Sequence, residues 1–215
     1  MALVLPHSIF VHTPKTAGQW CAKVLEPEEP RFLGRHHDTP AELRKRYPNA
    51  GYLPMFCFVR HPATWHLSWY SERALIAWDH VVSTSSYNDE VLGVIAMNTK
   101  IGASSCFNEY LVRTWDHYKN HGFCSLMFRH YATGCDRIYK FEKLYEGLGH
   151  ALSTWEPELN VLDRMDKTKP VNVRQKIGYA GYTKDQMKMV MEMESDACHR
   201  FNYHDLPEEL CAFTC

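Results

Sequence analysis

The chain has 215 residues and a formal net charge of -1 at pH 7, from 24 Lys and Arg against 25 Asp and Glu. This balance excludes a generally basic nucleic-acid-binding protein, so any site for a polyanion must be a local cluster of cations. With 45% hydrophobic and 13% aromatic residues, the chain can build the core of one domain. No run approaches the roughly 20 apolar residues of a membrane span, and the first six residues lack the pattern of a signal peptide, so we expect a cytoplasmic protein.

The eight cysteines contain no Cys-x-x-Cys pair and stand in apolar surroundings. This usage favours reduced, partly buried thiols over a disulfide framework. One cluster of soft ligands lies near the C-terminus, but its spacing fits no common zinc pattern, and we expect no metal there. Its members are Cys198, His199, His204, Cys211 and Cys215.

The first predicted strand covers the apolar residues 9–11, and a turn with a helix behind it follows. Pro14 ends the strand, and Gly18 allows backbone amides to approach a ligand at the positive end of the helix. Lys15 precedes this glycine and no earlier glycine stands in the turn, so the stretch is not the Walker A loop of nucleotide triphosphatases. The pattern predicts an anion site.

Two further segments repeat the order of strand, polar turn and helix. Residues 31–37 suit a second strand, and Thr39 is a good cap for the helix after it. Residues 55–59 form a continuous apolar run, typical of a strand covered on both faces, and Arg60 follows it directly. Pro62 then begins a helix expected to reach about residue 78.

Beyond this helix the sequence predicts an inserted helical lobe over about residues 80–123. Strands and helices follow the lobe. Alternating strands and helices favour an α/β fold with a parallel sheet, in which ligands bind beyond the carboxyl ends of the strands. Lys15, His37 and Arg60 all lie at the carboxyl ends of expected strands. The later elements are helices at 90–97, 106–118 and 125–131, a strand at 137–141, a helix at 142–152, an irregular stretch at 155–173, and a final helix from the Thr183 capping box to about 201.

The first turn resembles the loop H-x-P-K-T-x-G that holds the 5′-phosphosulfate in carbohydrate sulfotransferases that use 3′-phosphoadenosine 5′-phosphosulfate (PAPS). The matching residues are His12, Pro14, Lys15, Thr16 and Gly18. The resemblance implies that the phosphosulfate is bound by Lys15, Thr16, Ala17, Gly18, Gln19 and Trp20.

The second turn is similar to the element R-x-P-x-x-x-x-x-S-x-aromatic that binds the 3′-phosphate in the same family. Arg60, Pro62, Ser68 and Tyr70 match it. An arginine guanidinium and a serine hydroxyl can both donate to phosphate oxygens, which explains the two residue types. His61 departs from the pattern, because the family commonly has an acidic or amide residue at this place.

Weaker similarities concern a catalytic base and a closing loop. The stretch from His37 resembles the histidine-led helix start of heparan- and chondroitin-type sulfotransferases, in several of which that histidine is the base. His36 is adjacent and is the alternative. The stretch with Lys167 and Thr168 resembles a loop that closes on the nucleotide.

The resemblance implies a P-loop-like parallel sheet flanked by helices in one domain, with PAPS as sulfate donor and no metal. Lys15 would stabilise the leaving group and His37 would accept the proton of an acceptor hydroxyl on a glycan or small molecule, which the lobe would select. Two alternatives remain open. A nucleoside or small-molecule kinase would need a triphosphate loop and acidic magnesium ligands. An inactive PAPS-binding module would tolerate the loss of Lys15 and His37 but retain Arg60 and Ser68.

Overall fold

The computed structural model describes residues 2–26, 31–33, 38–49, 52–73, 101, 104–159, 161–169, 181–205 and 210. The described residues form two compact units. The first contains residues up to 60 and from 128 to 169, and the second contains the remainder. The second unit thus includes the described part of the expected lobe, the helix that begins at Pro62, the first part of α7 (Phe123–Ala132), and residues 181–205 and 210.

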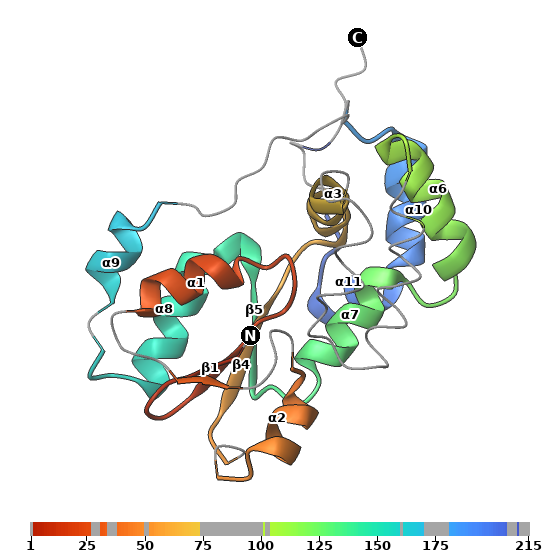
Figure 1. The fold of residues 1–215 in the computed structure, drawn as a ribbon. Helices are drawn as coiled ribbons and strands as arrows, with labels where there is room; N and C mark the ends of the chain where they lie inside the picture. Colours follow the sequence, from red (N-terminus) through yellow and green to blue (C-terminus); the bar gives the residue numbers. More distant parts are fainter. Residues whose placement is uncertain are drawn as a thin grey trace. The chain divides into compact units, whose positions relative to one another are not determined.

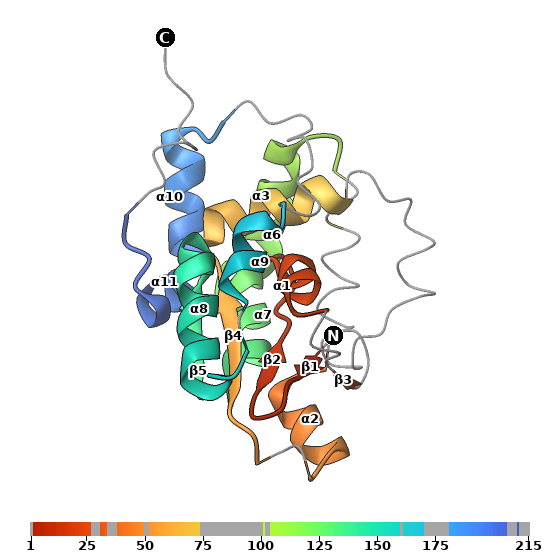
Figure 2. The same cartoon turned by 90° about the vertical axis from the view of Figure 1, so that its left-hand side faces the viewer.

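The first unit contains a mixed sheet of five strands in the order β3-β1-β2-β4-β5, which can be followed from edge to edge in Figure 2. β2, β4 and β5 are parallel, as expected, whereas β1 is antiparallel to both of its neighbours. The expectation of a wholly parallel sheet is therefore wrong. The strands are β1 (Ala2–Val4), β2 (Ile9–Val11), β3 (Arg31–Leu33), β4 (Met55–Val59) and β5 (Arg137–Lys140).

β1 was not predicted, because a strand of three residues carries no alternation of its own and is defined by its pairing with β2 and β3. A tight turn, closed by the Leu5 amide donating to the Ser8 carbonyl oxygen at 2.9 Å, joins it to β2 as a hairpin. Val11 and Leu33 both pair with Ala2 of β1. β2 and β3 therefore end at the same edge of the sheet, although the predicted strand at 31–37 is described only as far as Leu33.

Helices α1 (Gly18–Leu25), α8 (Leu144–Trp155) and α9 (Leu162–Lys167) cover one face of this sheet (Figure 1). Phe10, Phe56 and Phe58 project from β2 and β4 into this core, and Leu148 of α8 packs against them. All five residues of β4 are buried, as expected for a strand covered on both faces. α9 was not expected, because its six residues carry too little periodicity to distinguish a helix from a loop.

Two other predicted elements of the first unit agree with the structure. Thr39 caps α2 (Pro40–Arg46) in a capping box with Glu42, as its sequence indicated. The predicted strand at 137–141 is β5, and a 3-10 turn, η2 (Phe141–Lys143), leads from it into α8.

The second unit is helical. It contains α3 (Pro62–Arg73), α6 (Phe107–Tyr118), the first part of α7 (Phe123–Ala132), α10 (Lys184–Met193) and α11 (Ser195–Phe201). α10 packs against both α3 and α6 (Figure 1). The final helix is thus two helices, because the chain breaks at Glu194. The continuation of α3 beyond residue 73 and the predicted helix at 90–97 lie outside the described residues.

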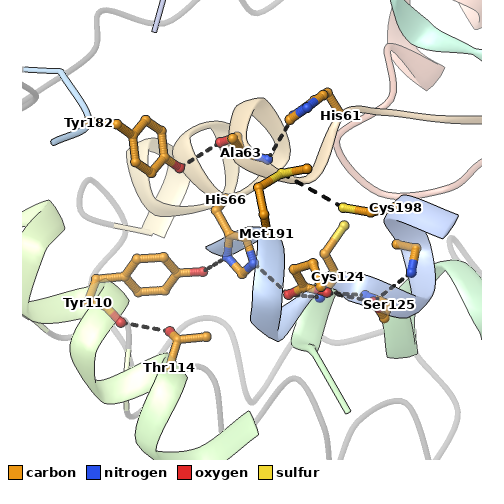
Figure 3. A network of polar contacts seen from close by, with 12 residues as sticks. His61, Ala63, His66, Tyr110, Thr114, Cys124, Ser125, Tyr182, Met191 and Cys198 are labelled. Atoms are coloured by element: carbon orange, nitrogen blue, oxygen red, sulfur yellow. Dashed lines mark hydrogen bonds and ion pairs between the residues drawn. The ribbon is translucent and has the colours of Figure 1, made fainter. Parts of the chain in front are cut away.

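The break at Glu194 supplies a buried carboxylate to the start of α7. Its oxygens accept the backbone N–H groups of Cys124 at 3.0 Å and Ser125 at 2.7 Å, and also the Ser125 hydroxyl at 2.7 Å. His66 of α3 lies 2.7 Å from the same carboxylate and 2.9 Å from the Tyr110 hydroxyl of α6 (Figure 3). His66 and Glu194 are both fully buried. This network links α3, α6, α7 and the α10–α11 junction.

Candidate functional site

The loop between β2 and α1 has an unusual backbone. Lys15 has φ 67° and Ala17 has φ 63°, in the left-handed region that few non-glycine residues adopt. Among the described residues, Asn202 is the only other non-glycine residue with a positive φ. Such conformations cost of order 1–3 kcal/mol and concentrate at functional sites, and they can turn successive amides toward an anion. The loop therefore has the backbone expected of an anion site.

The start of α1 has no side-chain cap of its own. Ala17, at the cap position, makes no side-chain hydrogen bond, and the first turn carries no acidic residue. The eight residues of α1 give it a positive end that favours an anion. Lys15 is half-buried in the turn just before it.

Two buried threonines lie inside the loop. The Thr16 hydroxyl donates to the Thr13 carbonyl oxygen at 2.7 Å, which fixes the turn across Pro14. The Thr13 hydroxyl is fully buried and has no hydrogen-bond partner among the described residues. A buried polar group without a partner is costly, and functional sites are one place where it is retained. No motif pointed to this feature of Thr13.

Gly18 is required by the packing of His12. A Cβ atom placed on Gly18 would lie 1.8 Å from His12 Cδ2, far inside van der Waals contact. The imidazole ring occupies the space that any other side chain would need, and only 9% of the His12 surface is exposed. His12 and Gly18, both matched by the loop motif, are thus neighbours that brace the loop.

The turn after β2 and the residue after β4 come together in the first unit. Arg60 Nη1 donates to the carbonyl oxygen of Lys15 at 3.4 Å. The Arg60 guanidinium also lies 4.3 Å above the ring of Phe141, the first residue after β5. Three neighbouring parallel strands therefore contribute Lys15, Arg60 and Phe141 to one edge of the sheet. The sequence did not predict Phe141 as a contact of Arg60, because only its place directly after β5 pointed to this end of the sheet.

The predicted closing segment lies against the helix after the loop. The indole Nε1 of Trp20 donates to the carbonyl oxygen of Thr168 at 3.0 Å, across 148 residues of chain. The Thr168 hydroxyl donates to the backbone carbonyl oxygen of Arg164 in α9 at 2.7 Å, whereas Lys167 forms an exposed ion pair with Asp163 at 2.7 Å. The structure thus joins Trp20 to Thr168, while Lys167 points to solvent with Asp163 as its partner.

Ser68 and Tyr70 belong to α3, in the second unit. Ser68 is half-buried and Tyr70 is buried. Burial, together with Cys106 and Glu109 nearby, raises the pKa of Tyr70, which is therefore a neutral hydroxyl at physiological pH. His61 departs from the family pattern but still provides hydrogen bonds at the start of α3, since its Nδ1 accepts the N–H of Ala63 at 3.2 Å.

The candidate base His37 and its neighbour His36 lie outside the described residues. The residue after them, Asp38, is buried and forms an ion pair with Arg46 at 2.9 Å. Among the residues that the structure describes, no three His, Cys, Asp or Glu side chains are grouped as metal ligands. In the same residues no helix has the length and apolarity needed to cross a membrane.

Comparisons with protein-family models, with curated proteins and with solved structures gave no match to this chain. The chemistry of the site therefore has to be argued from its own residues.

Proposed function

We propose that the protein is a PAPS-dependent sulfotransferase with a P-loop-like first unit, which transfers a sulfuryl group to a hydroxyl of a carbohydrate acceptor. One observation carries the proposal: Arg60 contacts the Lys15 turn at 3.4 Å, at the ends of two adjacent parallel strands. Two cations beside a strained turn and a helix N-terminus favour a ligand with two separate anionic groups. PAPS carries a 5′-phosphosulfate and a 3′-phosphate.

The described residues fit such a ligand. The turn from Lys15 to Gln19 would hold the phosphosulfate by backbone amides and the lysine ammonium, and the buried Thr13 hydroxyl would gain an acceptor. Arg60 would hold the 3′-phosphate by a forked pair of hydrogen bonds. The strain at Lys15 and Ala17 is consistent with a turn shaped for binding.

Bound PAPS would supply an activated sulfuryl group whose leaving group is a phosphate oxygen. Lys15 would stabilise the negative charge that develops on that oxygen, together with the amides of the turn. His37 would accept the proton of the attacking hydroxyl. Trp20 and Thr168, already joined by a hydrogen bond, would close one side of the nucleotide site and help to exclude water. Positioning and electrostatics would provide most of the acceleration, as in phosphoryl transfer.

The test is ligand binding followed by transfer. We expect 3′-phosphoadenosine 5′-phosphate (PAP) to raise the melting temperature of the protein, whereas ATP with magnesium does not. Transfer of labelled sulfate from PAPS to a panel of glycans should follow. Stabilisation by ATP with magnesium alone would point instead to a kinase, and binding of PAP with no transfer to any acceptor would point to an inactive module. No effect of PAP would reject the proposal.

A further inference from the structure

The two ring nitrogens of His61 contact different parts of the second unit. Nδ1 accepts the backbone N–H of Ala63 at 3.2 Å, and Nε2 lies 3.0 Å from the carbonyl oxygen of Asp205. Because Nδ1 is an acceptor, the proton of the neutral ring is on Nε2, from which it is donated to Asp205. His61 is 96% buried, with only 4% of its surface exposed. The ring therefore joins the start of α3 to a segment 144 residues later in the chain.

The cap on α3 is formed by the residue directly after Arg60. The His61 carbonyl accepts the N–H of Trp65 at 2.9 Å and the Thr64 hydroxyl at 2.9 Å, so His61 is the N-cap in both its backbone and its side chain. N-cap side chains are usually Ser, Thr, Asp or Asn, each of which can satisfy the helix start alone. A histidine satisfies the helix start and retains a second nitrogen for a distant partner.

That distant partner is itself anchored. Asn202 ends α11 in the left-handed conformation with φ 56°, and the Tyr203 N–H then donates to the Cys198 carbonyl at 2.9 Å. The Tyr203 ring packs edge-on against His61, with centroids 5.2 Å apart. Asp205 therefore holds its carbonyl on a segment fixed by the end of a helix.

A second contact restrains the same turn of α3. The Tyr182 hydroxyl donates to the Ala63 carbonyl oxygen at 2.8 Å, while the Ala63 N–H donates to His61 (Figure 3). Both peptide groups of Ala63 are thus held by buried side chains. Two segments from the last part of the chain, at Tyr182 and at Tyr203 to Asp205, determine the backbone that follows Arg60.

We infer that His61 is a positioning residue for Arg60, because its hydrogen bonds to Ala63 and Asp205 hold the backbone that directly follows Arg60. The expected effect on PAP binding rests on the proposed function. The expected effect on the conformation of Arg60 does not. Arg60 reaches the Lys15 carbonyl and the Phe141 ring from a backbone whose next residue is fixed by two hydrogen bonds. Without these bonds the guanidinium would sample more conformations, and binding would have to order it.

Three substitutions separate the two contacts of His61. In His61→Asn the amide oxygen can replace Nδ1 as the cap of α3, but the side chain is too short to reach Asp205. In His61→Gln the amide nitrogen can replace Nε2 as donor to Asp205, but the cap is lost. His61→Ala removes both. We expect the dissociation constant for PAP to rise about tenfold in His61→Ala and roughly threefold in each amide variant, from the usual effects of a lost cap and a lost hydrogen bond.

The matched control is His121→Ala, an exposed histidine of the same unit, which should leave PAP binding unchanged. The readout that does not need a ligand is NMR of the apoprotein: hydrogen exchange at the Ala63 amide and the Arg60 Nε–H resonance. We expect faster exchange and a shifted arginine resonance in His61→Ala, with the exchange restored in His61→Asn. Circular dichroism verifies that each variant is folded at the temperature used.

The outcomes separate the inference from the proposed function. If the wild type binds PAP and His61→Ala binds it equally well, the positioning role is overturned while the function stands. If the wild type does not bind PAP, the function fails. In that case an unchanged Arg60 resonance in His61→Ala overturns the positioning role, and a shifted resonance supports it.

Discussion

Arg60 Nη1 donates to the carbonyl oxygen of Lys15 at 3.4 Å, which joins the ends of two parallel strands through a backbone oxygen. The bond uses the backbone of Lys15 and not its side chain. It brings Arg60 to the turn that precedes α1, in a chain whose formal net charge is only -1. Because the bulk charge does not attract a polyanion, a site for one would depend on local cations such as these.

The first prediction concerns Lys15. Replacing it with alanine should lower the turnover number about a hundredfold, because one donor to the developing charge is lost from a preorganised site. Sulfate transfer from PAPS at saturating acceptor measures the effect. Lys188→Ala is the control, since Lys188 lies on the exposed surface of α10 next to Glu192 and should have normal turnover. Near-normal turnover of Lys15→Ala would remove Lys15 from the chemistry.

Gly18 and His12 should be coupled energetically. Gly18→Ala places a Cβ atom 1.8 Å from the His12 ring and should destabilise the protein by about 1–3 kcal/mol, as overpacking usually does. The double variant His12→Ala with Gly18→Ala should recover part of that loss, because the clash is gone. A double-mutant cycle from urea unfolding measures the coupling. Additive effects of the two substitutions would contradict the close contact.

Glu194 should be far more important for stability than its neighbour Glu192. Glu194 is fully buried, accepts the backbone N–H groups of Cys124 and Ser125, and lies 2.7 Å from His66 Nε2. In Glu194→Gln these groups lose their anionic acceptor. We expect a loss of about 3 kcal/mol in the free energy of unfolding. Glu192→Gln is the matched control, because Glu192 is exposed in an ion pair that contributes little. Equal stability of the two variants would show that the network does not hold the second unit.

The sequence predicted the parts of the fold that have strong local signals. The buried run of β4, the Thr39 and Thr183 capping boxes and the turn before Gly18 each follow from neighbouring residues. It could not predict contacts across long stretches of chain, such as His61 with Asp205 or Trp20 with Thr168. It also missed the antiparallel β1 and the break at Glu194, since both depend on partners far away in the sequence.

Cysteine reactivity should distinguish Cys106 from Cys198. Burial and the nearby Glu194 raise the pKa of the Cys198 thiol to about 12, so at pH 8 only about one molecule in 10⁴ carries the thiolate. Cys106 is exposed at the start of α6. Iodoacetamide at pH 8 should therefore label Cys106 well before Cys198, and raising the pH toward 12 should increase the labelling of Cys198. Peptide mass spectrometry measures both sites, with labelling in urea as the control. Equal rates in the folded protein would contradict the burial of Cys198.

The last prediction identifies the base. A histidine must be neutral to accept a proton from the acceptor hydroxyl, so the rate of transfer should rise with pH through the titration of an imidazole, at about 6.5 when unperturbed. His37→Ala should lose most of the turnover and this pH dependence while the affinity for PAP stays nearly normal, because the base acts on the acceptor. His36→Ala is the control, one residue away, and should retain both. If His36→Ala is the inactive variant, the role belongs to His36. If both variants keep the wild-type rate and pH profile, neither histidine is the base, and His117 and Asp116 on the exposed side of α6 are the next residues to replace.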